Sequence, residues 1–421
     1  MKKLNMFLLL SFYYIFGGVI NVPDDHSTIS AAVDNANSGD TIFVSSGTYN
    51  ESLWFSKHVH IIGDGLDGTM LWISDVFESD AVTIQNFEFT NGYSDMGSHL
   101  YISNSKVDFI NVRITENFSD SGSGGGLNIN GESEVGLHNS HILSNTAYIG
   151  GGIYIYSGGL GGGGCNHKAS LSITNTEIAA NISGHDGGAI YIDDKCSDVS
   201  VHSSVILDNQ SGNNGGGILN KGHLIIENSS IFDNNSGDSG SAFAIINHDT
   251  THIKNCTVTD NYGNSLVMLE EESGNDASEV LIDHSIFYTN QQESFNTVEG
   301  NVPVHVVNSL IEDYESISSN LIEWNVTGFV LDEDPQFSDG GDQFCPFPLS
   351  PNSPFINEGI GACNSSQSSS TGRLYVNSEI GDDDNNGTED FPLSSINRAI
   401  TLSDSGDTVY VSSGIYYENI N

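Results

Sequence analysis

Short apolar stretches alternate with single asparagines along most of the chain. In residues 171–181, Leu171, Ile173 and Ile178 alternate with polar residues, and Asn175 and Asn181 end the two stretches. A period of two places successive side chains on opposite faces of a β-strand, so each stretch predicts a short strand with one buried face. A glycine cluster and another apolar stretch follow at 187–192. We therefore expect a unit of three short strands, with turns at Asn and at Gly.

This unit repeats at a nearly constant length. Its first Asn position recurs after 25, 28, 36, 28, 25, 27, 29 and 24 residues, and the longest spacing contains a Gly-rich insertion at 157–165. Repeats of roughly 20–50 residues are typical of solenoids and propellers. The first position is occupied by Asn86, Asn111, Asn139, Asn175, Ser203, Asn228, Asn255, His284 and Asn308, and the second by Asn91, Asn117, Asn145, Asn181, Asn209, Asn234, Asn261 and Asn290.

The repeats predict an all-β fold, a right-handed single-stranded parallel β-helix (a solenoid) of about 10 coils. Coils of this length hold three short strands and stack about 4.8 Å apart, so that equivalent residues lie above one another. Asn tolerates the left-handed backbone conformation, and stacked amides bond to each other, so both Asn ladders are predicted to be structural. A leucine-rich repeat would need a leucine spacing that is absent, and a propeller would need longer units.

The two ends of the repeats indicate how the chain is divided. Residues 29–36 predict a short amphipathic capping helix, and the pattern of residues 38–49 returns 367 residues later at 405–416. We therefore expect a signal peptide at 1–18, a β-helix domain at 19–363, a Ser-rich linker at 364–371, and a truncated second β-helix domain at 372–421. We also expect the protein to continue beyond Asn421, because an unstacked edge strand would otherwise remain.

The N-terminus has the pattern of a secretory signal. Lys2 and Lys3 precede a mostly apolar stretch at 4–15, and Gly17 and Gly18 follow it. No later stretch is long and apolar enough to predict a transmembrane segment. The sequence therefore predicts a monomeric protein that is secreted or held at the cell surface, with the bacterial outer surface as the expected location.

Charge limits the classes of partner. The chain has 55 Asp and Glu against 11 Lys and Arg, a net charge of −44 at pH 7. Such a surface repels nucleic acid, anionic lipid and polyuronate chains, and it attracts divalent cations. Nucleic acid is therefore excluded as a partner, while calcium is a candidate cofactor.

Five cysteines in an exported chain allow disulfides. Cys165 and Cys196 follow equivalent strands and are candidates to join adjacent coils, while Cys345 and Cys363 flank a Pro-rich segment. Cys256 lies inside a repeat and is predicted to be a buried free thiol. No Cys and His spacing indicates a zinc site.

Several motifs resemble the pectin-lyase-like right-handed β-helix superfamily, in particular secreted bacterial choice-of-anchor proteins and polymorphic outer membrane proteins. The resemblance implies an exported β-helix, but it leaves the activity open because this superfamily includes lyases, hydrolases, esterases and adhesins. The matching segments are 39–44 with 47–49, the Asn and Gly-Gly-Gly-Ile units, 334–337, 349–359, and 375–392 with its Asn-Gly-Thr.

Candidates for catalysis are few. Lyase chemistry of the pectate type needs an Arg or Lys base beside calcium-binding carboxylates, but Arg113 is the only Arg before the linker and no Lys stands beside a repeated acidic ladder. The best carboxylate set for a glycosidase is Asp186, Asp193 and Asp194, with His185 nearby. A solvated corner is the alternative interpretation of this set.

A run at 382–387 offers closely spaced oxygen ligands, and Asp382 and Asp384 are the calcium candidates. It lacks the Glu that completes an EF-hand loop, and an acidic turn is the alternative. No nucleophile elbow, phosphate-binding loop or His-Glu-x-x-His motif is present.

The sequence therefore favours a non-catalytic surface protein that serves adhesion or contact with polysaccharide or cell-surface glycan. The alternatives are a polysaccharide lyase or glycoside hydrolase, and a structural spacer in a larger surface protein. The insertion at 157–165 is the expected contact point, because loops carry most specific contacts.

Overall fold

The computed structural model describes residues 17–66, 69–71, 75–77, 81–94, 100–158, 165, 167–246, 250–270, 279–288, 293–299, 303–312, 314, 323–338, 341, 343–355, 360–361, 373–377, 392–402, 408–412, 414 and 416. Cys363 and the predicted linker lie outside these ranges, as does the predicted signal peptide up to residue 16. The division into domains therefore stays a prediction.

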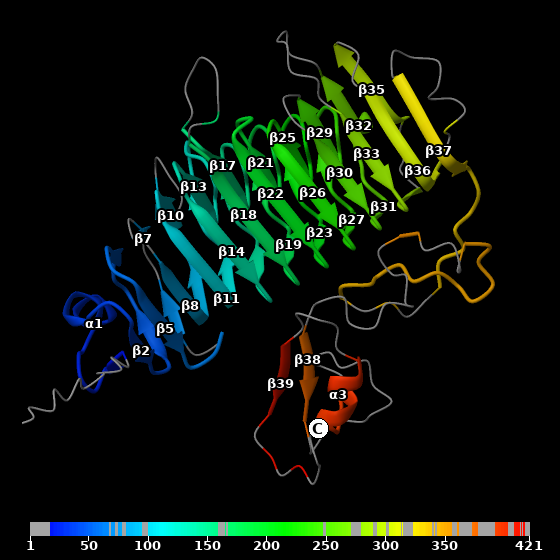
Figure 1. The fold of residues 1–421 in the computed structure, drawn as a ribbon. Helices are drawn as coiled ribbons and strands as arrows, with labels where there is room; N and C mark the ends of the chain where they lie inside the picture. The colour runs from blue at the N-terminus through cyan, green and yellow to red at the C-terminus, as the bar shows by residue number, and fades with distance from the viewer. Residues whose placement is uncertain are drawn as a thin grey trace, which may run out of the picture.

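The described repeats form a parallel β-solenoid, which confirms the predicted fold class (Figure 1). Every pairing between named strands is parallel, and each strand pairs with the equivalent strand one coil further on. The near strands in Figure 1 run downward while the coils advance to the right, which is a right-handed path. The number of coils stays a prediction, because several connecting segments lie outside the described residues.

Three sheets form the walls. Sheet A contains β1 (Val19–Val22), β2 (Asp40–Val44), β5 (Val59–Gly63), β8 (Val82–Thr90), β11 (Lys106–Thr115), β14 (Glu134–His138), β18 (Ala169–Thr174), β22 (Ser197–His202), β26 (His223–Glu227), β30 (Thr251–Lys254), β33 (Val280–Asp283), β36 (Pro303–Ile311) and β37 (Glu323–Leu331). Beyond the first Asn corner it continues as β3 (Gly47–Tyr49), β6 (Thr69–Leu71), β15 (His141–Leu143), β19 (Glu177–Ala179), β23 (Val205–Leu207), β27 (Ser230–Phe232), β31 (Thr257–Thr259) and β34 (Ile286–Tyr288).

Sheets B and C complete each coil. Sheet B contains β4 (Trp54–Phe55), β7 (Asp75–Phe77), β10 (Leu100–Ser103), β13 (Leu127–Asn130), β17 (Ile153–Tyr156), β21 (Ile190–Ile192), β25 (Ile218–Asn220), β29 (Phe243–Ile246), β32 (Ser265–Glu270) and β35 (Glu293–Glu299). Sheet C contains β9 (Tyr93–Ser94), β12 (Phe118–Ser119), β16 (Thr146–Ala147), β20 (Ile182–Ser183), β24 (Gln210–Ser211) and β28 (Asn235–Ser236).

The core is the lumen of the solenoid. Alternate side chains of each strand point inward and stack in columns, such as Leu171, Val199 and Leu224, all at most 2 % exposed. This arrangement is the direct result of the period-two pattern, because like residues in equivalent positions meet across coils.

The first Asn ladder has the predicted backbone, whereas the second differs. Asn139 and Asn175 have φ of 51° and 48°, the left-handed conformation. At the second corner the left-handed residue is the one before the Asn in most coils, for example Ala180 at φ 54°. The Asn itself is buried and its amide bonds along the axis: Asn181 Nδ2 donates to Asn209 Oδ1 at 2.9 Å. The second ladder is therefore structural through its side chains instead of through its own φ. Asn91 is an exception, because it is itself left-handed at φ 55° and Gly92 stands at the position of the buried Asn.

The N-terminal end carries helix α1 (Ile29–Asn35), which buries Ile29 and Val33 in the lumen. The Thr28 side chain accepts from the Ala31 N–H at 3.1 Å, and Glu51 accepts from the first two backbone N–H groups of the helix at 2.9 and 2.8 Å. These contacts satisfy donors that a helix N-terminus otherwise leaves unpaired.

The described residues at 337–338, 341, 343–355 and 360–361 lie against the outer face of sheet A beyond the Asn corner. The Phe347 ring lies 4.9 Å from the ring of Phe232, and Phe355 and Leu349 pack on Ile286. Gln343 Nε2 donates to Glu177 Oε2 at 3.0 Å. The predicted Pro-rich close of the domain is thus a covering segment over this face.

The repeated motif near the C-terminus has the same local structure as the N-terminal one. β38 (Arg373–Val376), α3 (Ile396–Leu402) and β39 (Thr408–Val411) form a strand, a helix and a parallel strand, as do β1, α1 and β2. The Tyr49 hydroxyl donates to Ser45 O at 2.8 Å, and the Tyr416 hydroxyl to Ser412 O at 3.0 Å.

Candidate functional site

The outward side chains of β11, β14, β18, β22 and β26 form three rows along the solenoid axis, because the strands pair in register. Side chains in equivalent positions are about 4.8 Å apart from coil to coil. The first row is Lys106, Glu134, Ser170, Asp198 and His223; the second is Asp108, Gly136, Ser172, Ser200 and Ile225; and the third is Ile110, His138, Thr174, His202 and Glu227.

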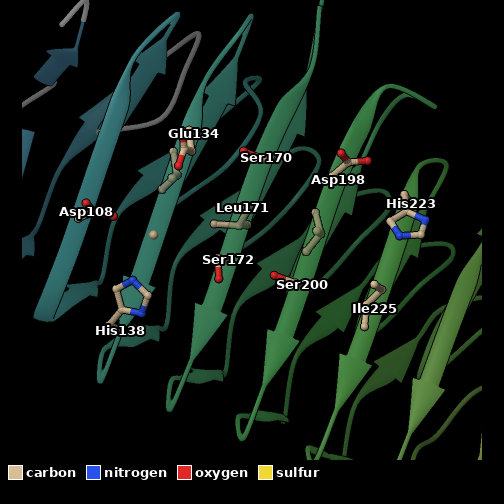
Figure 2. Close-up of a pocket in the computed structure, with 13 residues that line it drawn as sticks. Asp108, Glu134, His138, Ser170, Leu171, Ser172, Asp198, Ser200, His223 and Ile225 are labelled. Carbon is tan, nitrogen blue, oxygen red and sulfur yellow. The ribbon is translucent and has the colours of Figure 1, made fainter. Parts of the chain in front are cut away.

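A groove of about 450 Å³ lies over these rows. Its floor is low because the middle row contains Gly136, Ser172 and Ser200, which have small side chains or none. Glu134 and Asp198 stand along one side, with Ser170 between them on β18 (Figure 2). The groove therefore crosses the strands and has carboxylate, hydroxyl and imidazole groups along its walls.

Gly136 creates the gap at one end of the groove. A Cβ at this position would lie 2.5 Å from Asp108 Oδ1 and 2.7 Å from His138 Nε2. The side chains of Asp108 and His138 therefore occupy the space above Gly136, and a larger residue at this position would displace them. The result is a carboxylate and an imidazole facing the same small space, which are the two side-chain types most used for proton transfer.

Two lysines stand beside single carboxylates of this face. Lys106 Nζ lies 2.6 Å from Glu134 Oε1, and Lys168 Nζ lies 3.3 Å from Asp198 Oδ2. The separation of 28 residues between Lys106 and Glu134 equals one coil, and that of 30 between Lys168 and Asp198 exceeds the coil by two residues. These spacings were the available signal in the sequence. Both pairs are largely exposed, so each contributes little to stability.

A third cation, Lys221, meets one of the predicted catalytic carboxylates on the outer face of sheet B. Lys221 Nζ donates to the Tyr191 hydroxyl at 2.7 Å and to Asp193 Oδ1 at 3.2 Å. The Tyr154 hydroxyl donates to Asp193 Oδ2 at 2.6 Å, and its ring stacks on Tyr191 at 5.7 Å. Sequence reasoning missed Lys221, although it follows Asp193 by 28 residues.

The protonation of the Lys221 amine and of the two phenols argues against any of these three groups as a base. Burial alone would lower the pKa of Lys221, but the Tyr191 hydroxyl and the Asp193 charge outweigh it and raise that pKa above its ordinary value. Burial raises the pKa of Tyr191 to about 12 and also raises that of Tyr154. At neutral pH the amine is charged and both phenols are protonated, so none of them accepts a proton.

The other predicted carboxylates have separate partners. Asp194 Oδ2 accepts from the backbone N–H and hydroxyl of Ser157 at 2.9 and 2.7 Å. Asp186 Oδ2 lies 2.7 Å from His185 Nδ1, and its Oδ1 accepts from Asn214 N at 2.9 Å. Asp194 therefore holds the start of the 157–165 insertion through Ser157. Asp186 joins its own coil to the next one through the backbone of Asn214.

The cysteines follow the same coil register. A disulfide joins Cys165 and Cys196, whose strands β17 and β21 are adjacent. Cys345 is disulfide-bonded, and its predicted partner Cys363 lies outside the described residues. Cys256 is a buried free thiol, as predicted, and burial raises its pKa to about 12.

Metal ligands do not gather in the part of the chain that the structure describes: no three His, Cys, Asp or Glu side chains converge there. The calcium candidates Asp382 and Asp384 lie outside it. Among the same residues, no helix is long and apolar enough to cross a membrane.

Comparison with known proteins finds likenesses only among solved structures. No family model and no curated protein sequence matches the chain. Pectate lyase Pel9A is 16 % identical, with a TM-score of 0.45 over 81 % of this chain and 90 % of its own. A mutant of the PL6 family alginate lyase AlyGC is 12 % identical, with a TM-score of 0.41 over 94 % of this chain and 64 % of its own.

A third solved structure is the PL6 family polysaccharide lyase Pedsa3628 from Pseudopedobacter saltans. It is 13 % identical, with a TM-score of 0.41 over 82 % of this chain and 99 % of its own. At these identities and TM-scores the likeness assigns this chain no activity and no substrate. The β-solenoid assignment rests on the strand pairing, in which each coil repeats the register of the one before it.

Proposed function

We propose that this protein is an extracellular or surface β-helix protein that binds an extended polysaccharide in the groove over β11, β14, β18, β22 and β26. The observation that carries the proposal is the low middle row, Gly136, Ser172 and Ser200, flanked by carboxylate and imidazole side chains across five strands. A groove that runs along the solenoid axis fits a long chain better than a compact ligand.

The chemistry of the walls suits sugar hydroxyls. Asp and Glu accept hydrogen bonds, Ser both donates and accepts, and a neutral imidazole does each through one nitrogen. The coil spacing of about 4.8 Å is close to the length of one hexose unit in an extended chain. Successive sugars along the groove can therefore meet equivalent positions of successive coils.

The charge of the protein selects the kind of polysaccharide. With a net charge of −44 and with Asp108, Glu134 and Asp198 at the groove, a polyuronate would be repelled. We therefore infer that a neutral glycan is the preferred ligand, and that contact with such a glycan serves adhesion.

The test is to fill the groove. Ser172→Trp places a large side chain on the floor, and Asn325→Trp places the same side chain in the equivalent position of β37, outside the groove. Binding to neutral and acidic oligosaccharides, measured by calorimetry, should fall at least tenfold in Ser172→Trp only. Equal affinities in both variants, or no binding to any sugar, would overturn the proposal.

Polysaccharide cleavage is the second candidate, and it is favoured by Asp108 and His138 facing each other over Gly136. In this role one group would remove a proton and the other would orient or return it. Incubation with the same sugars should then release new reducing ends, or unsaturated ends that absorb in the ultraviolet. Asp108→Asn and His138→Gln should abolish the release while binding persists, and absence of any product would leave binding as the function.

A further inference from the structure

A strip of uncharged side chains runs along the outer face of sheet C. Register pairing aligns them one per coil, ending in an isolated bridge between Asn235 and Tyr262. In a chain with 55 Asp and Glu, this row contains none. The strip consists of Tyr93, Phe118, Thr146, Ile182, Gln210, Asn235 and Tyr262.

The strip exposes aromatic and apolar surface to an unusual degree. Tyr93 is 65 % exposed, Phe118 40 %, Ile182 45 % and Tyr262 37 %. The rings of Tyr93 and Phe118 are nearly parallel, with an angle of 9° and centroids 5.8 Å apart. Contiguous exposed apolar surface of this kind marks an interaction site more often than scattered single residues do.

Beside three consecutive rungs of the strip, the outward positions are glycines. The outward positions two residues further along successive coils are Gly184, Gly212 and Gly237. A Cβ on Gly212 would lie 2.3 Å from Gly184 O, and one on Gly237 would lie 2.0 Å from Gly212 O, so no larger residue fits. Over these three coils the strip therefore borders backbone without side chains, whereas Tyr148, which is 50 % exposed, occupies the equivalent position one coil earlier.

We propose that this strip is a second polysaccharide-binding surface, which takes an extended neutral glycan along the solenoid axis. The aromatic rings at its two ends provide apolar faces for sugar rings, and Thr146, Gln210 and Asn235 provide hydrogen bonds between them. One rung per coil matches one sugar unit at about 4.8 Å. The three glycines beside the strip leave room for the width of a sugar ring.

Charge identifies the occupant. Each copy of this chain carries a net charge of −44, so a second copy is repelled at long range, and so are acidic glycans and anionic lipid. The strip itself offers no ion pair to a cationic partner, although the acidic row of Asp208, Asp233 and Asp260 lies two residues before it. A neutral polysaccharide avoids the repulsion and uses the aromatic and amide groups that the strip provides.

The strip is distinct from the groove on sheet A, so the two can be tested separately in the full-length protein. The probes are the hexasaccharides of cellulose, xylan, mannan and laminarin, with a polygalacturonate hexamer as the acidic comparison. Tyr93→Ala and Phe118→Ala should each lower the affinity for one of the neutral probes about tenfold, as expected for aromatic residues that carry a large share of the binding energy. Trp54→Ala is the matched control, because Trp54 is 55 % exposed on another sheet.

The outcomes separate this inference from the proposed function. Retained affinity in Tyr93→Phe, together with loss in Tyr93→Ala and unchanged thermal unfolding, supports sugar stacking on the strip. Binding that Ser172→Trp abolishes and that no strip variant changes would overturn the strip and leave the groove in place. A dimer that sediments as such and dissociates in Phe118→Ala would overturn the glycan as the occupant.

Discussion

The Asn145 side-chain amide donates to Oδ1 of Asn181 at 3.0 Å, and both side chains are fully buried. Asn181 in turn donates to Asn209 Oδ1 and to Ile142 O, each at 2.9 Å. Asn181 Oδ1 also accepts a hydrogen bond from the backbone N–H of Asn145 at 3.0 Å. Each Asn therefore satisfies polar groups of three coils, and a buried polar group without a partner is costly.

Asn181→Ala should destabilise the protein strongly. The substitution leaves the amide of Asn145 and the carbonyl of Ile142 buried without their partner, at an expected loss of about 2–4 kcal/mol in the free energy of unfolding. Urea denaturation measures this loss. Asn264→Ala is the control, since that side chain is exposed and should change the free energy by less than about 0.5 kcal/mol. Equal losses would show that the ladder is not responsible.

The first Asn ladder should respond to backbone preference instead. Asn139 has φ 51°, a conformation that costs a β-branched residue more than about 1–2 kcal/mol. Asn139→Val should therefore lower the unfolding free energy by at least that amount, while Asn139→Gly should change it by less than about 1 kcal/mol. Ser170→Val, in an ordinary strand position, is the reference. A milder effect for valine than for glycine would contradict the assignment.

Stability should depend on pH through Cys256. Burial raises the pKa of its thiol to about 12, whereas an unfolded thiol titrates near 8.5. The folded state thus keeps the proton, so the stability contributed by the thiol is present below pH 8.5 and is lost as pH rises towards 12. Relative to Cys256→Ser, the natural chain should lose up to about 1.4 kcal/mol per pH unit in this window. Parallel stability curves for the two proteins would refute the prediction.

Lys221 should act as a structural cation. Lys221→Met removes the partner of Asp193 and of the Tyr191 hydroxyl, and we expect a loss of about 1–3 kcal/mol because the pair is partly buried. Lys168→Met breaks the exposed pair with Asp198 and should cost less than about 1 kcal/mol. If Lys221 were instead a catalytic base, its substitution would abolish a cleavage activity without lowering the thermal midpoint.

Local patterns were sufficient to predict the solenoid. The alternation around Leu171 and Ile173 predicts inward and outward faces, and the spacing of Asn139 and Asn175 predicts corners that stack. These are properties of single coils that repeat, so they are visible in a linear sequence. The second corner was predicted less well, because Ala180 takes the left-handed position and leaves Asn181 to bond through its side chain.

Properties that depend on register across coils were harder to predict. Ser140, Thr176 and Ser204 form a buried hydroxyl ladder in which each accepts a backbone N–H from the preceding coil, and Cys256 stands in the same column. The groove has the same origin, since Asp108 and His138 face each other only when β11 and β14 pair in register. The contact of Lys221 with Asp193 likewise appears only once the coils are aligned.

The buried ladders have a consequence for how such a molecule can change in length. Each ladder joins one residue per coil, so removal of a residue from within a strand shifts the rest of that strand out of its columns, whereas removal of a whole repeat keeps every column continuous. Residues 203–227 form one such repeat, from Ser203 to the position before Asn228. The coil is therefore the natural increment of growth and of shortening, and binding surfaces that follow the axis would lengthen or contract by one sugar-sized step with each coil.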